Sequence, residues 1–264
     1  MRIDEAAEAL LAAWDGKRQI APLSDGAGIT LDEGYAIAAR IAAMRQARGE
    51  RTLGRKIGFT NRTIWPIYNV SATVWGWMWE GGLHDIPEDG RIALPDRPEL
   101  RLEPEIVFGF ARSPASGMDA AALLGCLDWV AHGVELVTSA SAYPGWRFTA
   151  PDTAAAHGMH AALWIGPRRP ATAFDVAGLE DFALTLTGPD RTLRGEARDV
   201  LGDPLHALAH LVGLLTRHPA AGPIRPGEVV TTGTLTDAVP VARGQRWQTR
   251  LDGIALPGLD LTLV

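Results

Sequence analysis

Residues 100–110 constrain the fold more than any other part of the chain, because two glutamates interrupt a run of mostly apolar residues there. Successive side chains of a β-strand point to opposite faces, so Glu103 and Glu105 would share one face. The other face would be apolar and packed into a core, through Leu102, Ile106 and Phe108. Pro104 has no amide hydrogen and predicts a strand at a sheet edge or with a bulge. The segment therefore predicts a β-strand that presents two acids on one side.

These two acids suggest a metal site. Carboxylates on one face of a strand lie about 6.5–7 Å apart at their Cα atoms and repel each other. A hard divalent cation, with oxygen ligands at about 2.0–2.6 Å, fits between such a pair. Glu135 interrupts a second apolar segment, residues 133–138, where an unpaired carboxylate would be costly. Glu103, Glu105 and Glu135 are therefore candidate metal ligands, although the pattern alone also allows three exposed acids on a solvated sheet face.

Hydrophobic periodicity divides the chain into a helical N-terminal part and a mostly β remainder. Helices are predicted over residues 3–15, 31–48, 119–132 and 203–217. Strands are predicted over residues 54–60, 100–110, 133–138, 181–187, 229–232, 245–251 and 259–264. This order predicts an α+β fold. An N-terminal helical arm, residues 1–60, would pack on a core, residues 61–264, to give effectively one domain.

The composition argues against several classes of protein. The formal net charge of −6 gives no sign of a nucleic-acid surface. No apolar stretch approaches the roughly 20 residues that span a bilayer, and residues 1–14 show an amphipathic helix pattern rather than a signal peptide. The single cysteine, Cys126, cannot form an internal disulfide. We therefore expect a cytoplasmic protein that binds neither nucleic acid nor membrane.

Two biases in residue usage draw attention to particular positions. Only two of the 25 basic residues are lysines, Lys17 and Lys56. Lysine can lose its proton in a tuned environment, whereas arginine cannot near neutral pH, so Lys56 is a candidate functional residue. Four of the nine tryptophans lie within residues 65–79, which predicts a hydrophobic wall, a lid or an oligomer contact.

Several short motifs occur in a fixed order along the chain. They are GRKIGFTNR at 54–62, Glu103-Pro104-Glu105, VELV around Glu135, Asp152-Thr153, and VTTGTLT at 230–236. This set resembles the 2-oxopent-4-enoate (2-keto-4-pentenoate) hydratase and 4-oxalocrotonate decarboxylase family of the fumarylacetoacetate hydrolase superfamily. That family carries G-x-K-[IV]-G-[LF]-T-[SN]-R and an E-x-E metal motif. The resemblance covers nearly the whole chain and implies a fumarylacetoacetate-hydrolase-like mixed β core, a sandwich or roll, with an N-terminal helical part.

The resemblance implies a metal-dependent lyase acting on a small 2-oxo acid. A Mg²⁺ or Mn²⁺ ion on Glu103, Glu105 and Glu135 would be chelated by the substrate's 2-oxo group and carboxylate. The ion would stabilise an enolate, and a 2-hydroxy-alka-2,4-dienoate would be hydrated to a 4-hydroxy-2-oxo acid.

The same resemblance implies roles for further residues. Lys56, Glu80 and Asp152 are expected to be catalytic, Glu80 because it is the one acid in residues 74–80, where the family carries acids. Substrate contacts are expected from Arg62, Thr232, Gly233, Thr234 and His157. His160 is expected near the site without a defined role. The tryptophans of residues 74–80 imply a pocket for a bulkier or cyclic substrate tail.

Other functions remain open at this point. A decarboxylase of a 4-oxalocrotonate-like 2-oxo diacid would use the same chelate but needs a cation for the second carboxylate, for which Arg55, Arg62 and Arg147 are candidates. A C–C bond hydrolase of the same superfamily is a third possibility. A non-enzymatic alternative is a metal-binding partner subunit. The family implies a homo-oligomer, or a complex with a related decarboxylase or hydratase.

Overall fold

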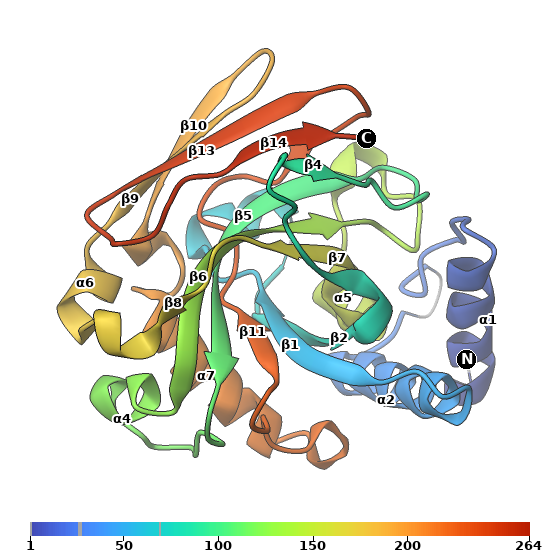
Figure 1. Cartoon of the computed structure of the whole chain (residues 1–264). Helices are drawn as coiled ribbons and strands as arrows, with labels where there is room; N and C mark the ends of the chain where they lie inside the picture. Colours follow the sequence, from blue (N-terminus) through green and yellow to red (C-terminus); the bar gives the residue numbers. More distant parts are fainter. Residues whose placement is uncertain (1, 26–27, 69) are drawn as a thin grey trace.

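Two helices at the N-terminus form a layer beside the β-sheets (Figure 1). The computed structural model describes residues 2–25, 28–68 and 70–264. Helices α1 (Ile3–Asp15) and α2 (Leu31–Ala47) agree with the predicted ranges. Thr30 caps α2 in a reciprocal capping box with Glu33, which satisfies two amides at the start of the helix. The apolar faces of α1 and α2 pack together through Ala6, Leu10, Ile37 and Ile41.

Two sheets make up the core (Figure 1). The larger has nine strands, seven of them in the order β2-β1-β11-β5-β6-β7-β3, with β12 on β5 and β8 on β6. Its strands are β1 (Thr52–Gly58), β2 (Val74–Trp79), β3 (Leu83–Asp85), β5 (Arg101–Phe110), β6 (Leu127–Val137), β7 (His160–Ile165), β8 (Arg169–Pro170), β11 (Val229–Thr231) and β12 (Val239–Pro240).

The smaller sheet packs over the larger one and buries the apolar face of β5 and β6. It has the order β10-β9-β13-β14-β4. Its strands are β4 (Arg91–Ile92), β9 (Ala183–Thr187), β10 (Thr192–Glu196), β13 (Arg246–Asp252) and β14 (Asp260–Leu263). The shared core includes Leu102, Ile106 and Phe108, all fully buried as the alternation predicted. The α+β prediction is confirmed.

The remaining α-helices each connect two strands in the chain. They are α3 (Trp65–Tyr68), α4 (Ala120–Leu124), α5 (Ala150–Ala155), α6 (Val176–Glu180) and α7 (Pro204–Thr216). The α7 start was predicted from its sequence, and Asp203 caps it by accepting from the His206 amide. None of the helices in the described ranges has the length and apolar character that a bilayer crossing requires.

The helix predicted over residues 119–132 is wrong for most of its length. Asp119 caps a helix as expected, but α4 ends at Leu124 and β6 begins at Leu127. β6 then pairs with β5 at ten positions. This long-range pairing outweighs the local helical periodicity, because tertiary contacts routinely override intrinsic propensity.

Pro104 lies in the middle of the sheet and not at its edge, so that part of the prediction is wrong. β6 pairs with one side of β5 along its length. On the other side, β12 pairs with residues 101–102 and β11 with residues 107–109. Between them the ladder is interrupted, and the Pro104 carbonyl accepts from the Leu235 amide at 2.9 Å. The N and O of one strand residue point to the same side, so the missing amide hydrogen faces this gap.

The proposed division of the chain at residue 60 remains a proposal. α1 and α2 form the helical part, whereas β1, which precedes residue 60, is hydrogen-bonded between β2 and β11 in the large sheet. A boundary near Thr52 would assign β1 to the core.

Candidate active site

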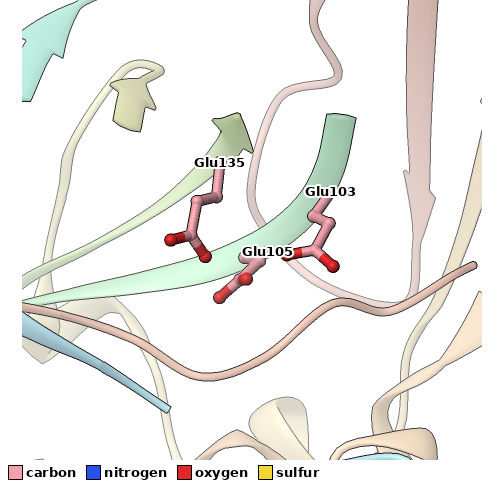
Figure 2. A group of neighbouring side chains, drawn as sticks. All are labelled: Glu103, Glu105 and Glu135. Atoms are coloured by element: carbon pink, nitrogen blue, oxygen red, sulfur yellow. The ribbon is translucent and has the colours of Figure 1, made fainter. Parts of the chain in front are cut away.

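Glu103, Glu105 and Glu135 converge on one face of the large sheet (Figure 2). Glu103 on β5 lies directly opposite Glu135 on β6, and Glu105 lies two residues further along β5. One oxygen from each carboxylate lies within 4.8 Å of the other two. Glu105 and Glu135 are fully buried and Glu103 is half-buried. The strand geometry predicted from the sequence is therefore confirmed, and the alternative of three exposed acids is wrong.

One buried cation accompanies the three acids. Lys56 on β1 lies with its Nζ 3.1 Å from Glu135 Oε2 and donates to the Gly158 carbonyl at 3.0 Å. Three carboxylates and one ammonium leave a formal charge of −2 in a buried site. That charge matches the charge of a divalent cation, and hard cations of this kind prefer oxygen ligands.

Burial and the neighbouring charges shift the pKa values of all three acids. Burial raises the pKa of Glu103 to about 7 although Lys56 opposes the rise. Burial and then the charge of Glu135 raise the pKa of Glu105 well above its usual value. Burial also acts on Glu135, but Lys56 and the His160 hydrogen bond outweigh it and lower its pKa. For Lys56, burial is outweighed by the three glutamates together, which raise its pKa.

Two of the carboxylates are held in place by neighbouring hydrogen-bond donors. Glu105 Oε2 accepts from the Gly233 amide at 2.7 Å, and Glu135 Oε1 accepts from His160 Nδ1 at 2.8 Å. Glu135 Oε2 is ion-paired with Lys56, whereas Glu105 Oε1 is buried and has no hydrogen-bond partner among the described residues. A buried polar oxygen without a partner is rare and calls for a ligand. The donor set and the unpaired oxygen of Glu105 therefore fit a divalent metal ion.

Glu103 and Glu105 line a cavity that contains both polar and apolar side chains. The polar lining residues are Lys56, Thr60, Asn61, Glu103, Glu105, Thr153, Thr234, Thr236 and Asp237. The apolar lining residues are Ile57, Phe59, Ile64, Val74, Val137, Trp146, Phe148 and Met159, and five of them, Phe59, Val137, Trp146, Phe148 and Met159, pack together in one cluster. The apolar side chains Phe59, Trp146 and Met159 have backbone φ angles of +57°, +60° and +66°. Such conformations cost about 1–3 kcal/mol each and concentrate at functional sites.

Glu80, expected to be catalytic, does not reach this cavity. It follows β2 at the end of the strand furthest from Val74, the β2 residue that lines the cavity. Its exposed carboxylate pairs with Arg51, with Arg51 Nε 3.0 Å from Oε2. The acid thus lies one strand length away from the cavity, which gives its expected catalytic role no support in this structure.

Asp152 and His157 also point away from the cavity. Asp152 accepts from the Ser24 amide at 3.1 Å and from Thr149 Oγ1 at 2.7 Å, so it tethers the N-terminal loop to α5. The His157 ring lies edge-on to Trp77 and Trp79 in a separate cavity beneath α1 and α2. Their neighbours in sequence, Thr153, Gly158 and Met159, line the active-site cavity instead.

The other expected substrate contacts divide into three cases. Thr234 lines the cavity, and its Oγ1 donates to the Thr236 carbonyl, so its contact with substrate remains a proposal. Gly233 and Thr232 do not line it: the Gly233 amide holds Glu105, and Thr232 binds the Ile106 carbonyl through its amide and hydroxyl. Arg62 is exposed, with its guanidinium carbon 5.9 Å from the Trp65 ring centroid, and its role as a substrate contact remains a proposal.

The tryptophans of β2 do not shape the substrate pocket. Trp75, Trp77 and Trp79 are buried on the face covered by α2, where Tyr35 stacks on Trp75 with centroids 5.4 Å apart. The aromatic wall of the cavity comes instead from Phe59, Trp146 and Phe148, on loops whose approach to the site has no local sequence signal. Their ordering depends on tertiary packing.

Known proteins resemble this chain over nearly its whole length. No family model matches the chain. The 2-keto-4-pentenoate hydratase of Burkholderia vietnamiensis is 30% identical over 257 residues, which cover 96% of this chain and 94% of that protein. This chain belongs to the 2-keto-4-pentenoate hydratase family. The 2-hydroxyhexa-2,4-dienoate hydratase of Comamonas testosteroni is 26% identical and covers 98% of this chain and 97% of its own. A 4-oxalocrotonate decarboxylase of a Pseudomonas species is 26% identical, with 92% of each chain covered.

Solved structures agree with the fold of the 2-keto-4-pentenoate hydratase family. The 4-oxalocrotonate decarboxylase of Pseudomonas putida, complexed with magnesium and adipate, has a TM-score of 0.86 at 21% identity and covers 99% of this chain and 97% of its own. The fumarylpyruvate hydrolase of Pseudomonas aeruginosa, complexed with Mn²⁺ and pyruvate, has a TM-score of 0.59 at 16% identity and covers 81% and 89%. The predicted fumarylacetoacetate-hydrolase-like fold is therefore confirmed.

Proposed function

We propose that this protein is a Mg²⁺- or Mn²⁺-dependent hydro-lyase that hydrates a 2-hydroxy-alka-2,4-dienoate with an uncharged tail to a 4-hydroxy-2-oxo acid. The observation that carries the proposal is the cavity whose lining combines two of the three convergent carboxylates with a cluster of apolar side chains. The hydratase names of relatives across the length of the chain support the same reaction.

The ion would be held by Glu103, Glu105 and Glu135, whose convergent oxygens and formal charge suit it. When bound, it supplies a Lewis acid that polarises the 2-oxo group and stabilises negative charge on the neighbouring carbon. Magnesium and manganese in the related solved structures support this choice of metal.

The chain's own polar groups would bind the substrate and hold protons. Lys56 lines the cavity beside Glu103 and Glu105, and its raised pKa keeps the ammonium charged, ready to bind an oxygen anion and to hold a proton at Nζ. Thr60, Asn61 and Thr234 supply neutral hydrogen-bonding groups near the acids. Asp237 is exposed and lines the same cavity, so it replaces Glu80 as the acid available for proton transfer at the tail.

The apolar wall favours hydration over decarboxylation of a diacid. A second carboxylate buried against Phe59, Trp146 and Phe148 would need a cation, because an unpaired charge in an apolar site is costly. No arginine lines this cavity among the residues that the structure describes. Arg55 binds the Ala221 carbonyl and lies 3.5 Å from Glu228, and both Arg62 and Arg147 are exposed. The lining of the cavity therefore favours a substrate with an uncharged tail.

The proposal is tested with the purified full chain. The protein is stripped with EDTA, reloaded with Mg²⁺ or Mn²⁺, and assayed by the loss of dienol absorbance and by NMR of the product. We expect metal-dependent formation of the 4-hydroxy-2-oxo acid from an alkyl-tailed monoacid, at more than tenfold higher kcat/KM than turnover of a 2-oxo diacid. Release of CO₂ from the diacid as the faster reaction would support the decarboxylase instead. Metal binding without turnover of either would support the non-enzymatic partner subunit.

Three further expectations from the sequence accompany this proposed function and are themselves proposals. The protein is proposed to be cytoplasmic, to form a homo-oligomer, and to associate with a related decarboxylase or hydratase. Sedimentation of the purified chain, alone and mixed with such an enzyme, tests the last two.

A further inference from the structure

His160 lies directly behind one of the candidate metal ligands. It is the first residue of β7, and its Nδ1 lies 2.8 Å from Glu135 Oε1. Both side chains are almost fully buried. Since an ionised carboxylate only accepts hydrogen bonds, His160 Nδ1 carries the proton in this bond. The other ring nitrogen, Nε2, has no hydrogen-bond partner among the described residues.

The geometry around Glu135 shows why this bond matters. Lys56 Nζ lies 3.1 Å from the second oxygen, Oε2, and is anchored on the other side by the Gly158 carbonyl. Rotation of the Glu135 carboxylate could bring both of its oxygens toward Lys56. Glu135 and Lys56 would then form a closed ion pair, and Glu135 would no longer offer an oxygen beside Glu103 and Glu105. The His160 bond fixes Oε1 and so opposes that rotation.

We propose that His160 is a positioning residue that holds Glu135 in the orientation required for metal binding. The inference rests on the proposed metal site and extends it by one residue. A donor behind a ligating carboxylate fixes its direction, and removal of such outer partners typically weakens metal affinity about 10–100-fold. His160 does not line the active-site cavity, so it acts through Glu135 and does not touch the substrate.

The position of the ring supports a fixed orientation. The far side of His160 faces Gly82, where a β-carbon would lie 3.2 Å from Nε2. Trp79 and Arg45 lie on the same side, lining the cavity that the ring borders beneath the N-terminal helices. The Nε2 side of the ring therefore faces this cavity while its Nδ1 faces Glu135.

Three variants of the full chain test the proposal. His160→Leu removes the donor at similar volume, His160→Asn keeps an amide donor near the Nδ1 position, and His84→Gln is the control. His84 lies on the neighbouring strand β3 with its ring against Trp164, at 4.6 Å between centroids. Binding of Mn²⁺ alone is measured by EPR and calorimetry, and the Mg²⁺ dependence of kcat is measured separately.

We expect His160→Leu to raise the Kd for Mn²⁺ by about 10–100-fold. His160→Asn should recover most of that loss, and His84→Gln should bind as the unmodified protein does. kcat at saturating metal should fall less than the metal affinity does, because the bound ion then holds Glu135 itself. If the substitutions acted only through lost packing, His160→Asn and His160→Leu would raise the Kd for Mn²⁺ to a similar extent.

Two results would overturn the inference while leaving the proposed function intact: unchanged Mn²⁺ affinity in a folded His160→Leu protein, or equal losses in His160→Leu and His160→Asn. Should His160→Leu fail to fold, His160→Ala replaces it as the variant without a donor. If the unmodified protein bound no Mn²⁺, the metal site would be refuted and this inference with it.

Discussion

The Gly233 amide donates to Glu105 Oε2 at 2.7 Å, and the Thr60 side chain fills the space where a β-carbon on Gly233 would lie. That β-carbon would be 2.0 Å from Thr60 Oγ1, and Gly233 has a φ of +99°. One residue thus combines a backbone conformation that favours glycine, a close approach and a hold on a candidate metal ligand.

Gly233→Ala should therefore disturb both stability and the metal site. We expect a loss of about 1–3 kcal/mol in the free energy of unfolding from the backbone conformation alone, with a further loss from the contact with Thr60. Mn²⁺ affinity should fall at least tenfold. Gly244→Ala is the matched control, because Gly244 has a φ of +84° but nothing within 4 Å of its β-carbon position. Urea unfolding and Mn²⁺ titration of both variants check this, and equal effects would refute it.

Glu103→Ala should abolish Mg²⁺-dependent activity while the fold is retained. Glu103 supplies one of three candidate ligands, and its pKa is raised to about 7 mainly by burial, so removing it relieves an unfavourable charge in the metal-free protein. We expect at least a 1000-fold loss of kcat/KM, with a thermal midpoint no lower than that of the metal-free parent. Full activity after chelation and metal refill would contradict the assignment.

The acid at the cavity mouth should matter more than the acid expected from the sequence. Asp237→Asn should lower kcat about 10–100-fold if Asp237 transfers a proton at the substrate tail. Glu80→Gln should leave kcat within about twofold, since Glu80 is exposed and pairs with Arg51. Steady-state kinetics of the two variants measure this. A larger loss of kcat in Glu80→Gln than in Asp237→Asn would support Glu80 as the proton-transferring acid.

The apolar wall should set which tail is accepted. Phe148 packs against Phe59 and Trp146 with ring centroids 5.6 and 5.7 Å apart. Phe148→Arg should lower kcat/KM for an alkyl-tailed dienoate at least tenfold and improve the relative use of a diacid. Phe148→Leu keeps the wall apolar and should preserve the preference. Competition between the two substrates measures it, and an unchanged ratio in Phe148→Arg would exclude Phe148 from tail selection.

His157 should make stability depend on pH. Burial lowers its pKa from 6.5 to about 3 in the folded chain. As the pH falls below 6.5, the unfolded chain takes up a proton that the folded chain does not. His157 therefore costs stability at up to about 1.4 kcal/mol per pH unit down to about pH 3. His157→Phe should flatten the fall in unfolding free energy between pH 6.5 and 4.5. Parallel slopes for both proteins would contradict the shift.

The metal end of the site was predictable from sequence because strand geometry is local. Glu103 and Glu105 share a face through a period of two, and an apolar segment around Glu135 was enough to suggest a second strand. Lys56 was recognised from its motif, and it lies in the cavity. The placement of the glutamates needed only residue spacing and the assumption of a sheet, whereas Lys56 needed the motif.

The rest of the fold and of the site could not be predicted from the sequence, because it depends on contacts between segments that are distant in the chain. Residues 119–132 carry a helical pattern, and only pairing with β5 turns most of them into a strand. Asp152 lies next to Thr153, yet the α5 helix directs one side chain to the N-terminal loop and the other to the cavity. The hydrogen bond from His160 to Glu135 joins residues 25 positions apart on neighbouring strands, and no spacing rule identifies it.

Pro104 has a consequence for the accessibility of the site. Residues 232–238 lie opposite residues 103–106 of β5, between the paired segments of β11 and β12. Any other residue at 104 would offer an amide hydrogen to that gap, and the crossing segment could then extend the ladder along this edge of β5. With proline the segment stays a loop, and its residues Thr234, Thr236 and Asp237 become walls of the cavity. The sheet is thereby left incomplete directly beside two of the candidate metal ligands.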